Sequence, residues 1–138
     1  MKIEKIMQHH KMIAMILYND EIEYGVHFYT PNTRTLQVGK QRRLVGEKIK
    51  AHKHVLVKTQ RREPLQEVLY IEKGKMRVIF YNDGGKVIEN RILKKGDLIL
   101  LISGGHGFEF LEETEMIEIK QGPYYPESRK DLDVKEKR

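Results

Sequence analysis

The chain has 138 residues, of which 39% are hydrophobic and 33% are charged, and its formal net charge is +6. This length fits one domain, and the composition is that of a folded globular protein rather than a disordered one. Cysteine is absent, which excludes disulfides, thiolate metal sites and cysteine nucleophiles. No apolar run approaches the roughly 20 residues that span a bilayer, and the first residues lack a secretory signal, so we expect a cytoplasmic protein without a membrane partner.

Turn residues separate short apolar runs along most of the chain, which predicts an all-β sandwich or barrel. Only residues 3–15 carry a helical pattern. Residues 76–93 read as a hairpin around an Asn-Asp-Gly-Gly turn. The apolar run 98–102 predicts a strand buried on both faces, and residues 108–111 and 116–119 predict a further strand pair joined by an acidic turn.

The end of the chain has a different composition. From Gly122 onward, two prolines and a run of mixed charge lack the apolar side chains that a core needs. We therefore expect a single domain over residues 1–122 and a charged tail over residues 123–138. This tail is predicted to be mobile or to lie on a neighbour.

Positive charge is concentrated in residues 40–62. This stretch holds nine Lys and Arg against one acid, Glu47, so its net charge is nine minus one, or +8. Such a cluster attracts small anions, nucleic acid or acidic lipid, but it can equally be a solvated strand face. We do not expect nucleic acid as a partner, because no aromatic stacking platform or recognition helix accompanies the charge.

A candidate metal site follows from the spacing of His52 and His54. Side chains alternate along a strand, so a His-x-His pair presents both imidazoles on one face. A hairpin that turns between Gln60 and Arg61 would place Glu67 directly opposite His54 and on the same face. His52 would then lie opposite Leu69, and Leu56 opposite Leu65.

His106 completes the predicted ligand set. It follows the apolar run in a Ser-Gly-Gly-His-Gly segment, whose glycines allow the backbone to aim the imidazole inward. Three imidazoles and one carboxylate suit a divalent ion such as Zn, Mn, Fe, Ni or Cu, and spacing alone does not choose among them.

These residues resemble the sequence motifs of the cupin family. The first motif has a glycine before a His-x-His pair and a glutamate before a second glycine, and it is matched by Gly46, His52, His54, Glu67 and Gly74. The resemblance covers residues 39–121. It implies a double-stranded β-helix, or jelly-roll barrel, with the metal inside and a homodimeric assembly.

The second cupin motif is matched from Gly96 to His106, with departures. Ile102 stands where the family has a proline, the segment is one residue shorter before His106, and the closing asparagine is missing. The distance from His54 to Glu67 is also longer than is usual in the family. The resemblance still implies that His106 supplies the last imidazole.

Four further residues are candidates for substrate binding, namely Lys58, Gln60, Tyr70 and Arg77. A Lys or Arg near the metal can hold a phosphate or carboxylate, and a Tyr or Gln can orient hydroxyls. The alternative is that strand alternation turns Tyr70 and Arg77 outward as ordinary surface residues. His27, on an alternating run, is a candidate to face the same cavity.

The predicted function is that of a metal-dependent isomerase or epimerase that acts on a small anionic carbohydrate-like substrate, a sugar phosphate or nucleotide sugar. The cupin resemblance supports this through the small cupins of bacterial sugar and polysaccharide metabolism. One alternative is an Fe(II)-dependent dioxygenase, because such a ligand set leaves positions open for substrate and O₂. Another is a non-catalytic ligand-binding or sensor module.

Overall fold

The computed structural model describes residues 2–17, 21–55 and 65–135. Twelve strands and one 3-10 turn make up the regular structure of these residues. Their bounds are β1 (Ile3–Gln8), β2 (Lys11–Leu17), β3 (Gly25–Phe28), β4 (Leu36–Arg43), β5 (Lys48–His54), β6 (Glu67–Lys73), β7 (Lys75–Tyr81), β8 (Val87–Lys94), β9 (Leu98–Leu101), β10 (Gly105–Phe110), β11 (Thr114–Gln121), η1 (Pro126–Ser128) and β12 (Arg129–Asp131). Across the described ranges, no helix has the length and apolar character to cross a membrane.

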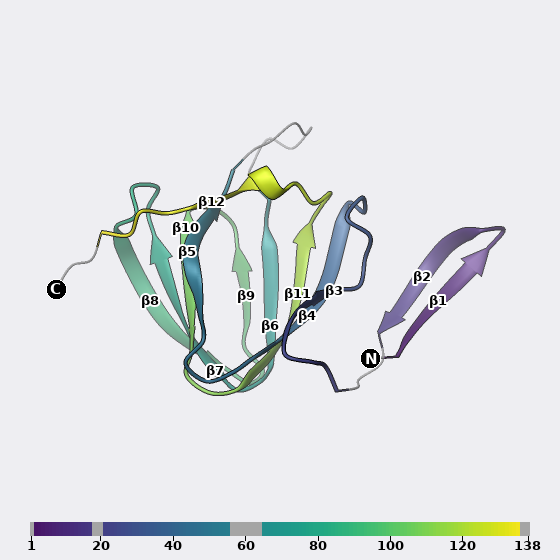
Figure 1. Ribbon diagram of the computed structural model, residues 1–138, viewed down its shortest axis with the longest axis horizontal. Helices are drawn as coiled ribbons and strands as arrows, with labels where there is room; N and C mark the ends of the chain where they lie inside the picture. The colour runs from purple at the N-terminus through teal and green to yellow at the C-terminus, as the bar shows by residue number, and fades with distance from the viewer. Residues whose placement is uncertain (1, 18–20, 56–64, 136–138) are drawn as a thin grey trace.

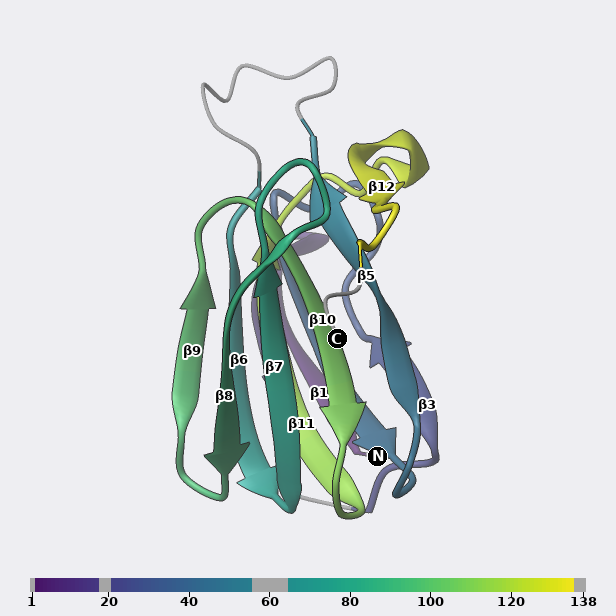
Figure 2. The ribbon, with the colours of Figure 1, turned by 90° about the vertical axis from the view of Figure 1, so that its left-hand side faces the viewer.

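Two five-stranded antiparallel sheets form the barrel (Figures 1 and 2). The strand orders are β12-β5-β10-β7-β8 and β3-β4-β11-β6-β9. The chain passes back and forth between the sheets, so strands that are neighbours in sequence mostly pair with distant ones. This is the jelly-roll architecture that the resemblance implied.

Glycines mark the corners where the chain changes sheet. Gly74 alone connects β6 of one sheet to β7 of the other, with φ at 93°. A Cβ at this position would lie 2.2 Å from the Glu113 carbonyl oxygen, so no larger residue fits. Gly46, between β4 and β5, has φ at 83° but open space around it. Both positions need the left-handed backbone that glycine adopts without steric cost.

The hydrophobic core fills one end of the barrel. Both sheets contribute to a cluster that includes Leu69, Ile71, Met76, Val78, Phe108, Phe110 and Met116, each of them almost fully buried. The hairpin predicted at residues 76–93 is confirmed as β7 and β8, with Gly85 in the turn at a φ of 84°. The turn of this hairpin lies beside the C-terminal segment, where the Lys135 N–H donates to the Gly85 carbonyl oxygen at 3.1 Å.

The N-terminal residues form a hairpin where the sequence indicated a helix. Gln8 pairs with Lys11, and the two turn residues, His9 and His10, have φ values of 47° and 64°. Positive φ at both central positions is typical of the tight turn that suits the twist of antiparallel strands. The strands β1 and β2 form a separate two-stranded sheet that projects from the barrel (Figure 1).

Three other predictions about strands are corrected. β9 lies at a sheet edge and leaves Leu98, Leu100 and Ile102 exposed, so it is not buried on both faces. β10 and β11 exist as predicted but lie in different sheets, because the acidic turn between them is a corner. The third correction concerns the tail: β12 pairs with β5, and Leu132 is buried against Ala51. The domain boundary at residue 122 stays a prediction.

Candidate metal centre

Three imidazoles meet on the inner face of the sheet that contains β5 and β10. His52 and His54 alternate along β5, and His106 of β10 is the register partner of His52. The ring centroids lie 4.6 to 5.6 Å apart. One nitrogen from each ring lies within 4.8 Å of the others, which is the spacing of ligands around one ion. His52 and His106 are buried and His54 is nearly so.

Glu67 approaches the imidazoles from the opposite sheet. Its Oε1 lies 3.3 Å from His54 Nε2, and its Oε2 lies 3.6 Å from His106 Nε2. The predicted hairpin register is wrong, because β5 and β6 belong to different sheets and His54 pairs with Arg129 of β12. The proposed turn and Leu56 lie outside the described residues. Glu67 faces the imidazoles across the barrel rather than along one sheet.

The hydrogen bonding of these side chains fits a metal ion. His52 Nδ1 lies 2.7 Å from the Lys50 carbonyl oxygen, so it carries the proton and leaves the Nε2 lone pair free. His54 Nδ1, His54 Nε2 and His106 Nε2 are buried and make no hydrogen bond within the described part of the chain. A buried polar atom without a hydrogen-bond partner lowers the stability of the fold unless a ligand or ion satisfies it. A divalent cation would satisfy Nε2 of both residues together with the Glu67 carboxylate.

The electrostatics place His52, His106 and Glu67 in the protonation states that a metal requires. Burial lowers the pKa of His106 to about 4, and the charge of His52 acts in the same direction. Burial also lowers the pKa of His52. Burial opposes ionisation of Glu67, but His54, His106 and Lys120 outweigh it and hold the pKa of that carboxyl below its ordinary value. Neutral imidazoles and an ionised carboxylate are the forms that bind metal.

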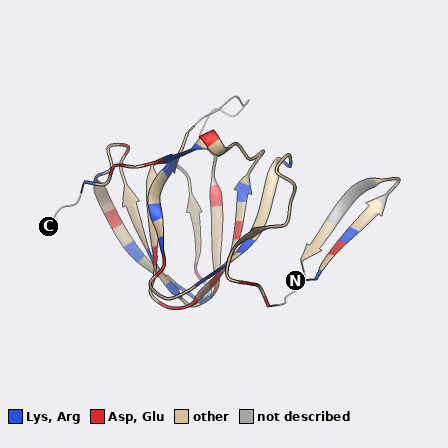
Figure 3. Cartoon of the chain, viewed as in Figure 1, with Lys and Arg blue, Asp and Glu red and all other residues tan. Residues whose placement is uncertain are grey.

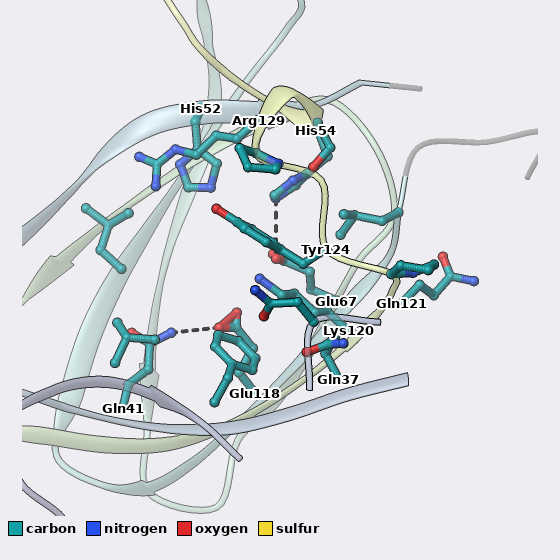
Figure 4. A pocket seen from close by; sticks show the side chains of 18 of the residues that line it. Gln37, Gln41, His52, His54, Glu67, Glu118, Lys120, Gln121, Tyr124 and Arg129 are labelled. Carbon is teal, nitrogen blue, oxygen red and sulfur yellow. Dashed lines mark hydrogen bonds and ion pairs between the residues drawn. The ribbon is translucent and has the colours of Figure 1, made fainter. Parts of the chain in front are cut away.

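A cavity of about 330 Å³ opens beside the imidazoles, and His52, His54 and Glu67 form part of its wall (Figure 4). Its other walls carry three cationic side chains, Arg43, Lys120 and Arg129. Lys120 Nζ lies 4.3 Å from the Phe28 ring centroid and 5.5 Å from that of Tyr124.

The opposite end of this cavity holds Gln41 and Glu118 (Figure 4). Gln41 Nε2 donates to Glu118 Oε1 at 2.9 Å. Burial and the charge of Glu67 raise the pKa of Glu118 to about 7. The cavity thus has an imidazole end beside Arg129 and a carboxyl end, with Lys120 between them (Figure 4).

The residues predicted to bind substrate do not line this cavity where they are described. Tyr70 lies on the outer face of β6 and is 39% exposed, because it is offset from Glu67 by an odd number of positions. Arg77 faces outward from β7 and lies 3.5 Å from Glu109. His27 also turns away, and its Nε2 contacts backbone carbonyls at 3.1 Å. Lys58 and Gln60 lie outside the described residues.

Sequence reasoning missed the wall residues that lie on β11 and in the C-terminal segment. Glu118 and Lys120 alternate with Ile117 and Ile119, which resembles a strand with a solvated polar face. The available sign in the sequence was the apolar Met116, which shares the face of Glu118 and Lys120, and the structure shows that it is fully buried. Tyr124 and Arg129 had no comparable sign, since they fall in the predicted tail.

Over residues 40–55, the described part of the basic stretch does not form a single surface patch. β4 and β5, which carry most of it, lie in different sheets, and the cations are spread over the barrel (Figure 3). Most of these cations face an acid that lies elsewhere in the chain: Lys40 with Glu72, Arg42 with Glu113, Lys50 with Asp131 and Lys53 with Asp83. Among the described cations of this stretch, Arg43 is the one that lines the cavity.

Comparison with known proteins supports this architecture through structure alone. No protein-family model and no curated protein matches the sequence. Among solved structures, oxalate decarboxylase from Bacillus subtilis is similar with a TM-score of 0.59 and 22% identity over 80% of this chain and 29% of that chain. KdgF from Halomonas sp. is similar with a TM-score of 0.54 and 20% identity over 78% and 87% of the two chains.

An RmlC-like cupin protein from Desulfovibrio desulfuricans matches with a TM-score of 0.53 and 14% identity over 84% of this chain and 96% of that chain. The chain spans only 29% of the oxalate decarboxylase chain and 22% of a salicylate 1,2-dioxygenase chain from Pseudoaminobacter salicylatoxidans. At these identities the likeness shows the fold. The chain therefore has the cupin fold, and its His52, His54 and His106 group is suited to a divalent metal ion.

Proposed function

We propose that this protein is a metal-dependent isomerase or epimerase that acts on a small anionic carbohydrate-like molecule, such as a sugar phosphate or nucleotide sugar. One observation carries the proposal: a buried group of three imidazoles and a carboxylate opens onto a cavity of about 330 Å³ whose walls carry Arg43, Lys120 and Arg129. This volume lies at the small end of ligand pockets, which favours a compact substrate.

The ligand set in this proposal is His52, His54, His106 and Glu67. A divalent metal held by these residues would polarise a carbonyl or hydroxyl oxygen of the substrate. Lys120 and Arg129 line the same cavity and would attract and orient the anionic group. Isomerisation also requires a group that moves a proton at carbon, and Tyr124 is a phenol of the cavity wall that could do so.

Metal analysis of the double variant His52→Ala/His54→Ala tests the ligand set. Wild-type protein purified without added metal should contain about one equivalent of a divalent ion, and the double variant should contain none while it stays folded. His27→Ala is the matched control, because this histidine faces away from the cavity. Stoichiometric metal in the double variant would contradict the ligand set.

Activity assays decide between the reaction classes. Protein loaded in turn with Zn, Mn, Fe and Ni should interconvert isomers of a sugar phosphate or nucleotide sugar without consuming oxygen. Ligand-dependent oxygen uptake by the iron-loaded protein would instead support the dioxygenase alternative. Tight ligand binding without turnover under any metal would support the sensor alternative.

A homodimer is part of the same proposal, and the outer face of the sheet that contains β11 supports it. Apolar side chains gather there, including Leu36, Tyr70, Leu98, Leu100 and Ile119, all of them exposed. Exposed apolar faces of this kind mark association surfaces. The isolated hairpin of β1 and β2 also needs packing, since two strands alone are marginally stable in water. The cytoplasmic location stays a prediction.

Light scattering coupled to size exclusion tests the dimer. The wild-type chain should elute with twice the monomer mass, and Leu98→Lys/Leu100→Lys should give a folded monomer because two charges would be buried at the interface. The control Glu89→Lys changes an exposed residue of the other sheet and should leave the dimer intact. A monomeric wild type would contradict the assembly.

A further inference from the structure

The cavity has a second polar group that the proposed chemistry does not use. Glu118 of β11 is 7% exposed and lies at the end of the cavity away from the imidazoles (Figure 4). Within the described residues, its one hydrogen bond comes from the neutral amide of Gln41, and the charge of Lys120 acts on it only from beyond ion-pair distance. A buried carboxylate with so little support is unfavourable for folding, so this carboxylate is a candidate for a role with a ligand.

The neighbours of Glu118 fix which of its oxygens is available. Arg43 Nε donates to Gln41 Oε1 at 3.0 Å. A guanidinium has donors only, so the amide of Gln41 must turn its oxygen to Arg43 and its nitrogen to Glu118. The side-chain nitrogen of Gln41 therefore donates its hydrogen bond to Oε1 of Glu118. The other carboxylate oxygen has no hydrogen bond from a described residue, and Glu118 lines the cavity.

Gln37 also lies in the cavity wall, but both the nitrogen and the oxygen of its side-chain amide already make hydrogen bonds. Its Nε2 donates to the carbonyl oxygens of Pro31 and Arg34, and its Oε1 accepts from the Thr30 hydroxyl. Its hydrogen bonds hold the loop before β4. Glu118 is therefore the polar wall group at this end whose remaining acceptor can meet a ligand.

We propose that Glu118, oriented by Gln41, determines which groups bind at the end of the substrate that lies away from the imidazoles. There it accepts hydrogen bonds from hydroxyl groups and repels a second anionic group. The ligand class is a sugar of about monosaccharide size with one anionic group, which lies toward Lys120 and Arg129. A carboxylate accepts hydrogen bonds from hydroxyls but repels another anion in a site of low dielectric. This inference rests on the proposed function for the position of the anionic group.

Binding of two matched probes tests the role of Glu118. D-Glucuronate has one carboxylate and hydroxyls at its other end, whereas D-glucarate has a carboxylate at both ends. We expect metal-loaded wild-type protein at pH 8 to bind glucuronate at least about tenfold more tightly than glucarate in isothermal titration calorimetry. Glu118→Gln should reduce this ratio to within about threefold, because the amide is uncharged and can donate.

Control measurements separate this inference from the proposed function. Glu112→Gln removes an exposed carboxylate outside the cavity and should keep the wild-type ratio. An unchanged ratio in Glu118→Gln, equal affinities in the wild type, or no binding of glucuronate would each overturn the role of Glu118. Metal content of the same samples is read separately: stoichiometric metal without a probe preference overturns this inference alone, and absence of metal overturns the proposed function.

A crystal structure tests the role of Glu118 if the Glu118→Gln variant does not fold. In wild-type crystals soaked with glucuronate, the free oxygen of Glu118 should lie within hydrogen-bonding distance of a sugar hydroxyl. A bound sugar whose hydroxyls avoid Glu118, or whose carboxylate lies against it, would overturn the inference.

Discussion

Ionisation of Glu118 should destabilise the fold, and Glu118→Gln should remove that effect. The pKa of this carboxyl is raised from an ordinary value of 4.5 to about 7 by burial and by the charge of Glu67. Between these two values the folded chain binds more protons than the unfolded chain, so the free energy of unfolding falls as pH rises through this window. The full penalty is about 3 kcal/mol, and about 2 to 3 kcal/mol of it develops between pH 5 and pH 8.

The glutamine variant keeps the oxygen that accepts the hydrogen bond from Gln41 and loses the titration. Relative to wild type, its free energy of unfolding should therefore increase by about 2 to 3 kcal/mol from pH 5 to pH 8. For a domain of this size, that difference corresponds to about 10 °C in Tm. A chelator is present during the urea unfolding, so that bound metal does not add a pH dependence of its own.

Glu112→Gln is the control for this experiment, because its carboxylate is exposed and should give a pH profile parallel to wild type. Parallel profiles for Glu118→Gln and wild type would refute the reasoning. They would mean that the carboxyl is solvated or paired in the folded protein, and that the cavity is not as dry at this end as the structure indicates.

Three further outcomes are expected. Gly74→Ala should lower the free energy of unfolding by more than about 3 kcal/mol, because strain at positive φ is joined by a collision with the Glu113 carbonyl. Gly46→Ala should lower it by about 1 to 2 kcal/mol, because only the strain applies there. Equal losses in urea unfolding would contradict this. Leu132→Ala should cost about 2 kcal/mol and speed proteolysis within residues 123–131. Chelation of metal should lower Tm, since a metal at 100-fold its Kd contributes about 2.7 kcal/mol.

Local patterns predicted the parts of the site that depend on one strand at a time. Alternation placed His52 and His54 on one face, and the glycines around His106 allowed its inward position. Glu67 was chosen correctly as a neighbour of these imidazoles but from a register that does not exist. An alternating pattern states which residues share a face, but it does not state which sheet the strand will join.

The rest of the structure depends on contacts between distant residues. The face of β9 that turned out to be exposed is as apolar as the buried one, so no local signal separates an edge strand with an outer apolar face from a central strand. The tail has few apolar residues, yet Leu132 packs with Ala51 and Tyr81, Val134 packs against the same cluster, and β12 pairs with β5. Two apolar side chains and backbone pairing barely alter composition, so composition predicted a free end.

The C-terminal segment crosses the open end of the barrel, and its contribution has a consequence for how such a protein can diversify. The histidines come from β5 and β10, but Tyr124 and Arg129 reach the cavity from the segment that follows β11. The imidazoles and these wall residues are therefore different side chains, although β12 pairs with β5 at His52 and His54. Exchange of Tyr124 and Arg129 alone, with Leu132 and the pairing of β12 kept, would alter the charge of the cavity and leave the imidazoles in place.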